Sequence, residues 1–312
     1  MLAKSTTRKK NYHDCRRLFL KSIFTTCSAL AFGELSVFSK DRNFIGPNFQ
    51  GEAIFDRIVA KARLNHWNKL AIGDLMGKIA EELAGTPYVA NTLELSTDRE
   101  FCSVNFKGLD CVTFFETTLD FARILKKDLH SPTDLVKEVQ FTRYRAGVVG
   151  DYTSRLHYTT DWFVDNQRKK VIQLLDNLPE VMPFTQKVSV MSDHPDSSIQ
   201  LKAHPELVPI IKRQEAAINN LALKYVPMEK IADIEHLLNT GDIVGVCSNA
   251  AGIDITHTGL IYCDQQGVRH FMDASSKKSA MQVQIENGPI SKTLNWSKNL
   301  TGAMFARPLE PA

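Results

Sequence analysis

A cysteine stands at the start of a predicted helix in the stretch "FKGLDCVTFFETTLDFARIL", residues 106–125. Asp110 is a good N-cap residue, and apolar residues recur behind it at helical spacing, at Val112, Phe115, Leu119, Ala122 and Leu125. Cys111 therefore falls in the first helical turn, where the helix dipole favours the thiolate form of a nucleophile. The carboxylate of Asp110 opposes this effect. The alternative role for Cys111 is that of a small, half-buried apolar residue.

His257 is the candidate general base for such a nucleophile. It begins the predicted strand "HTGLIYC" and follows Cys111 by 146 residues, within the range typical of papain-type enzymes. A cysteine nucleophile needs a base within hydrogen-bond reach, and the base needs a third group that fixes its orientation. The spacing alone is weak support, because most of the nine histidines must be surface or structural residues.

The composition excludes several classes of protein. With 312 residues, 43% of them hydrophobic and 23% charged, the chain can bury a full core, and disorder is not indicated. The net charge of +3 is misleading, since residues 1–33 hold seven Lys or Arg against one acid. The rest of the chain holds 31 basic and 34 acidic residues. This balance predicts no binding to nucleic acid or to an anionic membrane.

The first 33 residues resemble a bacterial twin-arginine export signal. Arg16 and Arg17 precede a modest apolar run in "CRRLFLKSIFTTCSALAFG", with a small-residue cleavage site after Ala31. This run is too short to anchor a helix across a bilayer, and no later segment is long and apolar enough to do so. We therefore expect a periplasmic or secreted protein, not an integral membrane protein in its mature form, with residues 34–312 as one domain. The alternative is a basic tail that leads into a core helix.

Four cysteines remain after this signal: Cys102, Cys111, Cys247 and Cys263. Their spacings lack the close pairs of a zinc site, so a metal centre is not expected. One disulfide is possible in an oxidising compartment, and Cys247 with Cys263 is the candidate pair.

The order of the predicted elements indicates an α+β fold. Residues 50–84 carry two helical patterns, residues 110–126 form the helix that begins near Cys111, and residues 131–205 are mixed. Residues 242–286 contain short apolar or alternating runs separated by turn signals, which are typical of an antiparallel meander. Helices followed by a sheet disfavour a doubly wound parallel sheet. The chain has no Gly-rich phosphate loop, so nucleotide chemistry is not expected.

Four blocks of the sequence carry a family resemblance. They are, in chain order, "GTPYVANTLE", "LDCVTFFE", "YRAGVVGDYTSRLHYTTDW" and "GDIVGVCSNAAGIDITHTGLIY". Together they resemble the bacterial N-acetylmuramoyl-L-alanine amidase-like family, a branch of the NlpC-type papain-like cysteine peptidases, over about residues 85–284. The resemblance implies a papain-like fold, in which the nucleophile at a helix N-terminus packs on an antiparallel sheet. Residues from about 131 to 205 would then be a family-specific insertion.

The resemblance also assigns roles to residues. It implies that Cys111 is the nucleophile, that His257 is its base, and that the hydroxyl of Tyr88 lies beside the nucleophile and stabilises the oxyanion. This chemistry needs no metal or organic cofactor. Strand positions three apart face opposite sides, so only one of Asp273 and His270 can face the base. The resemblance implies that it is Asp273, which holds the place of the third polar residue in the superfamily. We expect Asp273 to accept a hydrogen bond from Nδ1 of His257, although a histidine often holds this place in the superfamily.

The block "SRLHYTTDWFVDN" sets this branch apart and is the predicted substrate-recognition segment. Its candidate binding residues are Arg155, His157, Tyr158, Asp161 and Trp162. Arg155 could pair with a substrate carboxylate, and Trp162 could present its ring to a sugar. Alternatively, Trp162 belongs to the core, and Arg155 and Asp161 form a structural ion pair.

These features predict an exported cell-wall hydrolase that acts on peptidoglycan or muropeptides. It would cleave the amide between N-acetylmuramic acid and L-Ala through a Cys-His-Asp thioester mechanism. Two alternatives remain open. An endopeptidase of the same superfamily would cut between D-Glu and diaminopimelate, and a degenerate relative would bind peptidoglycan without cutting it. The presence of both Cys111 and His257 disfavours the degenerate relative.

Overall fold

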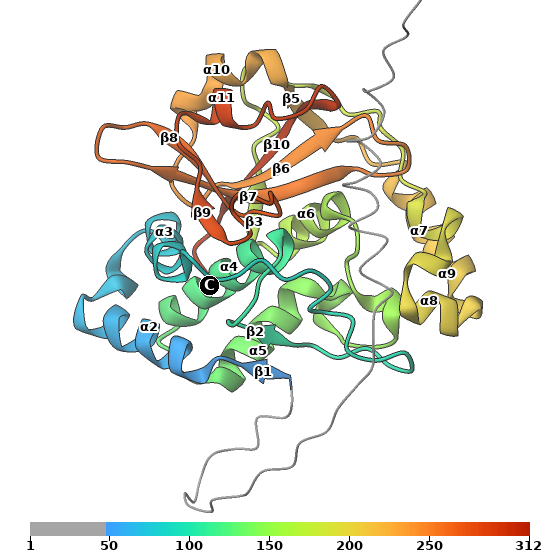
Figure 1. Cartoon of the computed structure of the whole chain (residues 1–312), viewed down its shortest axis with the longest axis horizontal. Coiled ribbons are helices and arrows are strands. Elements are labelled where there is room, and N and C mark those ends of the chain that lie inside the picture. Colours follow the sequence, from blue (N-terminus) through green and yellow to red (C-terminus); the bar gives the residue numbers. More distant parts are fainter. Residues whose placement is uncertain (1–47) are drawn as a thin grey trace, which may run out of the picture. The chain divides into compact units, whose positions relative to one another are not determined.

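Helices cover both faces of an antiparallel sheet in the computed structural model, which describes residues 48–312 (Figure 1). The predicted export signal therefore lies outside the described residues. The expected α+β class with an antiparallel sheet is confirmed for the part of the chain that the structure describes.

The amino-terminal part is helical because its apolar residues recur at helical spacing. α2 (Glu52–Leu64) buries Phe55, Ile58, Val59 and Ala62. α3 (Ile72–Leu83) follows after the short helix η1 (Trp67–Lys69) and buries Leu75, Met76, Ile79 and Leu83 among others. β1 (Phe49–Gln50) pairs in parallel with β2 (Val104–Asn105) in a small separate sheet. These helices lie within the range over which the sequence predicts them.

α4 (Cys111–Lys126) is the central helix, and thirteen consecutive residues of it are buried. Polar residues of this helix are buried together with the apolar ones. Glu116, Asp120 and Arg123 each find a polar partner on α5 (Pro132–Arg143), at 2.6–2.8 Å. The two helices are thus joined by buried polar contacts in addition to apolar packing.

The segment after α5 is mixed and contributes to the core. It contains η2 (Arg145–Gly147), η3 (Tyr152–Ser154), α6 (Thr159–Arg168), β3 (Ile172–Leu174), β4 (Met182–Pro183), α7 (Val190–Asp193), η4 (Pro195–Ser197), α8 (Ile199–Ala203), η5 (Pro205–Leu207) and α9 (Val208–Ile218). Trp162 and Phe163 of α6 are buried in the same apolar cluster as α4. α6 of the predicted insertion is therefore part of the main core, whereas Met191 of α7 and Leu201 of α8 pack in a separate small cluster.

The main sheet has eight strands in the described residues. They include β5 (Lys224–Pro227), β6 (Ile243–Ser248), β7 (Ile255–Cys263), β8 (Arg269–Ala274), β9 (Val283–Ile285) and β10 (Leu300–Pro308). The order is β4-β5-β10-β6-β7-β8-β9, with β3 also paired to β10, and the pairs are antiparallel. β6 to β9 are the predicted meander. The predicted range of 242–286 missed β10, which inserts between β5 and β6.

Side chains from the two faces of the sheet enter different apolar clusters, because they alternate along each strand. Leu260 and Met272 share a cluster with α3 and α4. Ile261 and Phe271 share the other cluster with α10 (Ile231–Ile234) and α11 (Ile290–Thr293). The short helices η6 (Met228–Lys230) and η7 (Glu235–Leu237) flank α10. β7 and β8 are thus packed on both faces and form a firm base for functional side chains.

Candidate active site

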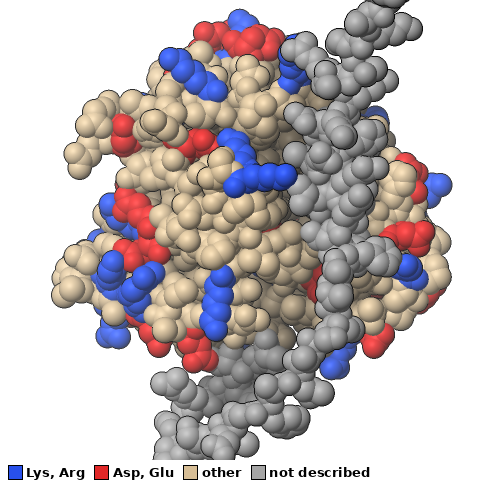
Figure 2. Space-filling view, in the orientation of Figure 1, with Lys and Arg blue, Asp and Glu red and all other residues tan. Residues whose placement is uncertain are grey.

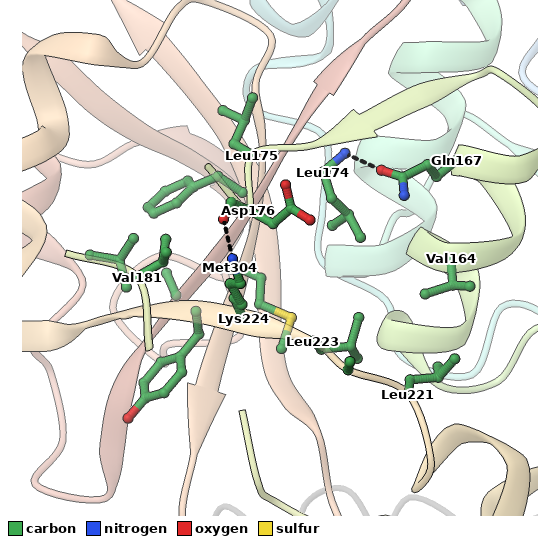
Figure 3. Close-up of a pocket in the computed structure, with 15 residues that line it drawn as sticks. Val164, Gln167, Leu174, Leu175, Asp176, Val181, Leu221, Leu223, Lys224 and Met304 are labelled. Atoms are coloured by element: carbon green, nitrogen blue, oxygen red, sulfur yellow. Dashed lines mark hydrogen bonds between the residues drawn. The ribbon is translucent and has the colours of Figure 1, made fainter. Parts of the chain in front are cut away.

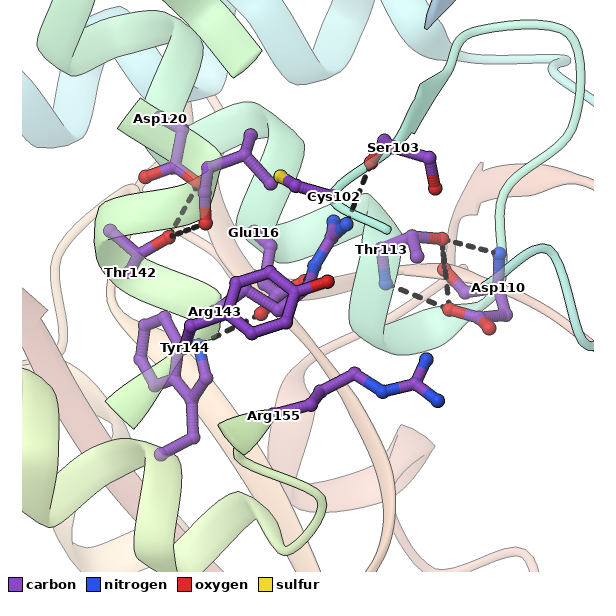
Figure 4. A network of polar contacts seen from close by, with 12 residues as sticks. Cys102, Ser103, Asp110, Thr113, Glu116, Asp120, Thr142, Arg143, Tyr144 and Arg155 are labelled. Atoms are coloured by element: carbon purple, nitrogen blue, oxygen red, sulfur yellow. Dashed lines mark hydrogen bonds and ion pairs between the residues drawn. The ribbon is translucent and has the colours of Figure 1, made fainter. Parts of the chain in front are cut away.

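Cys111 is the first residue of α4, and a capping box fixes the start of this helix. Oδ1 of Asp110 accepts a hydrogen bond from the backbone N–H of Thr113 at 2.7 Å, and Oγ1 of Thr113 accepts one from the backbone N–H of Asp110 at 2.9 Å (Figure 4). The carboxylate of Asp110 is thereby engaged by the helix backbone. The thiol of Cys111 forms no disulfide and is half-buried. This places a free thiol at the positive end of a buried helix.

His257 on β7 interacts with both Cys111 and Asp273. Its Nε2 lies 2.7 Å from Oδ2 of Asp273, whose side chain is only 2% exposed. Burial alone would lower the pKa of His257. The negative charge of Cys111 and the hydrogen bonds to Asp273 and Cys111 outweigh burial and raise this pKa to about 10. The arrangement therefore favours the protonated, imidazolium form of His257.

The register of β7 and β8 explains why Asp273, and not His270, contacts His257. Tyr262 pairs with His270 and Leu260 with Met272, so Asp273 lies on the face of His257 and His270 on the other. The ring nitrogens of His270 lie 3.0 Å from Oδ2 of Asp264 and 3.1 Å from the carbonyl oxygen of Glu286. The expectation that Nδ1 of His257 meets the carboxylate is wrong. Asp273 contacts Nε2 instead.

An aromatic group that the sequence interpretation missed supports His257. The ring centroids of Phe271 and Trp296 lie 5.9 and 5.7 Å from that of His257, and the two aromatic rings stack on each other. Gly259 leaves room for this group, because a Cβ there would lie 2.6 Å from the ring of Phe271. The glycine inside the strand "HTGLIYC" could have indicated this close approach from the sequence, because a glycine within a strand often marks such a place.

Backbone hydrogen bonds on two sides hold the segment of Tyr88 near Cys111. Its N–H donates to the carbonyl oxygen of Met281 at 2.9 Å, and the next N–H, of Val89, donates to that of Leu109 at 3.0 Å. Burial raises the pKa of Tyr88, and the negative charge of Cys111 raises it further. The hydroxyl therefore stays protonated and able to donate a hydrogen bond.

Two of the predicted substrate-binding residues have internal partners. Nη2 of Arg155 lies 2.6 Å from Oε1 of Glu94, and its Nε lies 3.3 Å from Oε1 of Glu100. Asp161 pairs instead with Arg145, at 2.6 Å. The alternative of a structural ion pair between Arg155 and Asp161 is therefore wrong in its partners, although both residues do form ion pairs.

The other three predicted binding residues also point into the protein. Trp162 is 1% exposed and donates from Nε1 to Oε1 of Glu116 at 2.9 Å, so it has no free face for a sugar. Tyr158 donates from its hydroxyl to Glu215 at 2.7 Å. Nε2 of His157 lies 2.7 Å from the carbonyl oxygen of Tyr152, and burial lowers the pKa of His157. All five predicted binding residues therefore have partners within the protein.

The candidate disulfide is absent, since Cys102, Cys111, Cys247 and Cys263 are all free. Cys247 is buried in the cluster around α4, whereas Cys263 packs against the cluster on the opposite face of the sheet. Opposite faces keep the two sulfur atoms apart. Cys102 is buried beside the carbonyl oxygen of Val136, and burial raises the pKa of its thiol to about 12. Of these four, Cys111 is the one that contacts a histidine.

Other features of the described residues lie apart from this site. A pocket of about 130 Å³ is lined by Val164, Gln167, Leu174, Asp176, Leu223 and Met304 among others (Figure 3). Cys111, His257 and Asp273 do not line it. Residues 48–312 hold no group of three or more His, Cys, Asp or Glu that could bind a metal ion. No helix in this part of the chain has the length and apolarity needed to cross a membrane.

Charged residues are mixed on the visible surface. Figure 2 shows Lys and Arg interspersed with Asp and Glu on this face, without a large area of one sign. The excess of three acidic residues that the sequence gives for residues 34–312 is consistent with this view. Such a face lacks the basic stripe that phosphate backbones require.

A protein-family comparison matches most of the chain. The family model for N-acetylmuramoyl-L-alanine amidase-like proteins, also called AmiA-like, matches residues 78–295. These residues include Tyr88, Cys111, His257 and Asp273. No curated protein matches this sequence.

Solved structures from three organisms share the fold. An N-acetylmuramoyl-L-alanine amidase from Bacteroides uniformis has a TM-score of 0.70 and 29% identity, over 77% of this chain and 99% of that one. A Bacteroides fragilis protein described as a candidate xylanase has a TM-score of 0.66 and 30% identity, over 75% and 99% of the two chains. A Legionella pneumophila protein has a TM-score of 0.62 at 18% identity, over 84% and 98%, and supports the fold alone.

Proposed function

Because the chain belongs to the N-acetylmuramoyl-L-alanine amidase-like family, we propose that it hydrolyses the amide between N-acetylmuramic acid and L-Ala in peptidoglycan fragments. The observation that supports this most strongly is that His257 interacts with the thiol of Cys111 on one side and with the carboxylate of Asp273 on the other. This arrangement suits acyl transfer from an amide through a thioester, with Cys111 as the nucleophile, His257 as the base and Asp273 as the group that orients the base.

The first half of the reaction forms the thioester. The thiolate of Cys111 attacks the amide carbonyl carbon, and the carbonyl oxygen takes the negative charge. The backbone N–H of Cys111, which has no acceptor within the helix, and the hydroxyl of Tyr88 stabilise this oxyanion. His257 then gives its proton to the amide nitrogen as the C–N bond breaks. The peptide leaves with a free amino group, and the muramoyl acyl group stays on the sulfur.

The second half releases the acid. Neutral His257 removes a proton from a water molecule, and the resulting hydroxide attacks the thioester carbon. The C–S bond breaks, so that the carboxylic acid leaves and Cys111 returns as a thiolate beside protonated His257. Asp273 keeps the imidazole ring oriented through both halves and stabilises its charged form.

The proposal includes a papain-like, NlpC-type fold for the described residues. Its support is the position of Cys111 at the start of a buried helix that packs on an antiparallel sheet, together with His257 on that sheet. Within this superfamily, an endopeptidase acting between D-Glu and diaminopimelate would use the same residues. The family match favours the amidase over this alternative.

Two further alternatives fit the site less well. A glycosidase, the activity that the name of the Bacteroides fragilis protein suggests, needs a pair of carboxyl groups that flank the bond to be cut. Here Asp110 caps α4 and Asp273 is bonded to His257, so neither is available for that role. A binding module without catalysis would not need the contact between His257 and Cys111.

Mass spectrometry of products from defined muropeptides tests the proposal. Wild-type protein should release a peptide with a free L-Ala amino group from MurNAc-L-Ala-D-Glu-diaminopimelate. Cys111→Ala and Cys111→Ser should fold normally and lose activity by roughly a thousandfold or more, because the nucleophile is gone. The sugar-free tripeptide should stay intact. Cleavage of that tripeptide before diaminopimelate would establish the endopeptidase instead, and normal turnover by Cys111→Ala would exclude a thiol mechanism.

We also propose export through the twin-arginine route, from the pair Arg16-Arg17 and the apolar run behind it. Replacement of both arginines by lysine should leave unprocessed precursor in the cytoplasm, because the route recognises the arginine pair and not positive charge alone. Fractionation and immunoblotting would measure the processed protein outside the cytoplasm. Unchanged processing of the double variant would refute the proposed route.

A further inference from the structure

Trp296 is a large aromatic residue that stays partly exposed next to the base of the site. Its ring centroid lies 5.7 Å from that of His257, with the two ring planes at 88°. It also stacks on Phe271, at 20° between the planes. The side chain nevertheless keeps 39% of its surface exposed. Since His257 is itself mostly buried, the indole offers apolar surface to a molecule that approaches this side of the base.

Lys277 places a positive charge over the same indole. Its Nζ lies 5.3 Å from the ring centroid of Trp296, and its side chain is 41% exposed. Glu286 also pairs with Nζ. An ammonium group has three N–H donors, so the pair with Glu286 leaves donors for another acceptor. An aromatic surface and a cation thus lie in sequence from His257 outward.

The direction of the reaction says which part of the substrate meets these residues. His257 gives its proton to the leaving amine, so the nitrogen of L-Ala must lie at the imidazole ring. The peptide that continues from L-Ala then passes over the residues packed on that ring. The α-carboxylate of D-Glu follows about two residues along, and two extended residues span about 7 Å. The contact from His257 to Trp296, at 5.7 Å, and the contact from Trp296 to Lys277, at 5.3 Å, are each shorter than this reach.

We propose that Trp296 and Lys277 form the subsite for the leaving peptide, with L-Ala packed on the indole and the free α-carboxylate of D-Glu bound by Lys277. This inference rests on the proposed function, because it takes the orientation of the substrate from the proton transfer. It moves peptide recognition from the block "SRLHYTTDWFVDN" to the loops after β8 and α11. Trp296 lies just beyond residues 78–295, which the family model matches.

Binding to the full-length Cys111→Ala protein tests the subsite without hydrolysis. The probes are MurNAc-L-Ala-D-Glu and MurNAc-L-Ala-D-isoglutamine, which differ only in having a carboxylate or a carboxamide at the α-position. Calorimetry should show that the carboxylate ligand binds roughly three- to tenfold more tightly, as expected for an exposed charge pair. Adding Lys277→Gln should abolish this preference. Adding Trp296→Ala should weaken both ligands by roughly tenfold, since the apolar surface serves both.

Lys278 supplies the matched control, because it is the next residue of the same loop and is also exposed. Lys278→Gln removes the same charge and should keep the preference for the carboxylate. Equal affinity of the two ligands for the parent, or a preference that survives Lys277→Gln, overturns the subsite. Hydrolysis by wild-type protein is measured separately. A preference for the carboxylate that depends on Lys277, without hydrolysis, supports the subsite and rejects the amidase. Hydrolysis without that preference supports the amidase and rejects the subsite.

Discussion

The contact between Asp273 and His257 can be tested by the single substitution Asp273→Asn. Asparagine has nearly the size of aspartate but no charge, and its NH₂ group cannot accept from the ring. In the structure, Oδ2 of Asp273 lies 2.7 Å from Nε2 of His257, and only 2% of the aspartate side chain is exposed. The hydrogen bond is therefore short, charge-assisted and shielded from water.

The size of the effect follows from that environment. A hydrogen bond to a charged group contributes about 1.5–3 kcal/mol, and each 1.4 kcal/mol is a factor of ten. Loss of this bond should weaken the stabilisation of the imidazolium and lower the pKa of His257 from about 10. The imidazolium must also be held in place to protonate the leaving amine, so the lost free energy corresponds to a fall in kcat/KM of roughly 10- to 150-fold. A wrongly oriented ring would increase the loss further.

The assay measures kcat/KM on a muropeptide together with the rate at which iodoacetamide alkylates Cys111. Both should fall in Asp273→Asn, while the melting temperature reports that the variant is folded. His270→Ala is the matched control, since His270 lies three residues away on β8 and bonds to Asp264. It should stay within roughly threefold of wild type, about 0.6 kcal/mol on the barrier. A folded Asp273→Asn protein with wild-type kcat/KM would refute the triad.

Two further predictions concern charges at and near the site. Cys111→Ala should lower the pKa of His257 from about 10, because burial lowers this pKa and the thiolate is a main cause that raises it. NMR titration measures this pKa. His257 should lose its proton only as the pH approaches 10 in the wild type and at lower pH in the variant. Equal pKa values of His257 in the two proteins would refute the ion pair. In the wild-type protein, Nε of Arg143 lies 2.8 Å from Oε2 of Glu116. Glu116→Gln leaves this buried guanidinium without its ionic partner, so the free energy of unfolding, measured in urea, should fall by about 3–5 kcal/mol. A loss below about 1 kcal/mol would show that the pair is not structural.

Local patterns in the sequence predicted the parts of the site that depend on local geometry. The N-cap at Asp110 and the helical spacing behind it placed Cys111 at a helix start. Strand alternation separated Asp273 from His270. The side of the ring that meets Asp273 was predicted wrongly, because it depends on where α4 approaches β7. No pattern within either segment encodes that approach.

The roles of the buried polar residues could not be predicted from local patterns. Trp162 bonds to a glutamate 46 residues earlier, and Arg155 pairs with Glu94, which is 61 residues away. The charged and aromatic residues of "SRLHYTTDWFVDN" suggest a binding surface as long as their partners in the fold are unknown. Tertiary packing decides between the two outcomes, and here it buries the carboxylate of Glu116 between Trp162 and Arg143 (Figure 4).

The candidate active site lies where the helical layer meets the sheet, and residues 85–89 connect the two. Gly85 donates its N–H to the carbonyl oxygen of Val283 at 2.9 Å, on the β9 side of the sheet. Four residues later, Val89 donates to the carbonyl oxygen of Leu109, which immediately precedes the cap of α4. β9, the strand that follows Asp273, and the helix that begins with Cys111 are therefore tied to one short segment. The hydroxyl of Tyr88 belongs to that segment, so in the proposed mechanism the element that aligns Cys111 with His257 also carries the donor that stabilises the oxyanion.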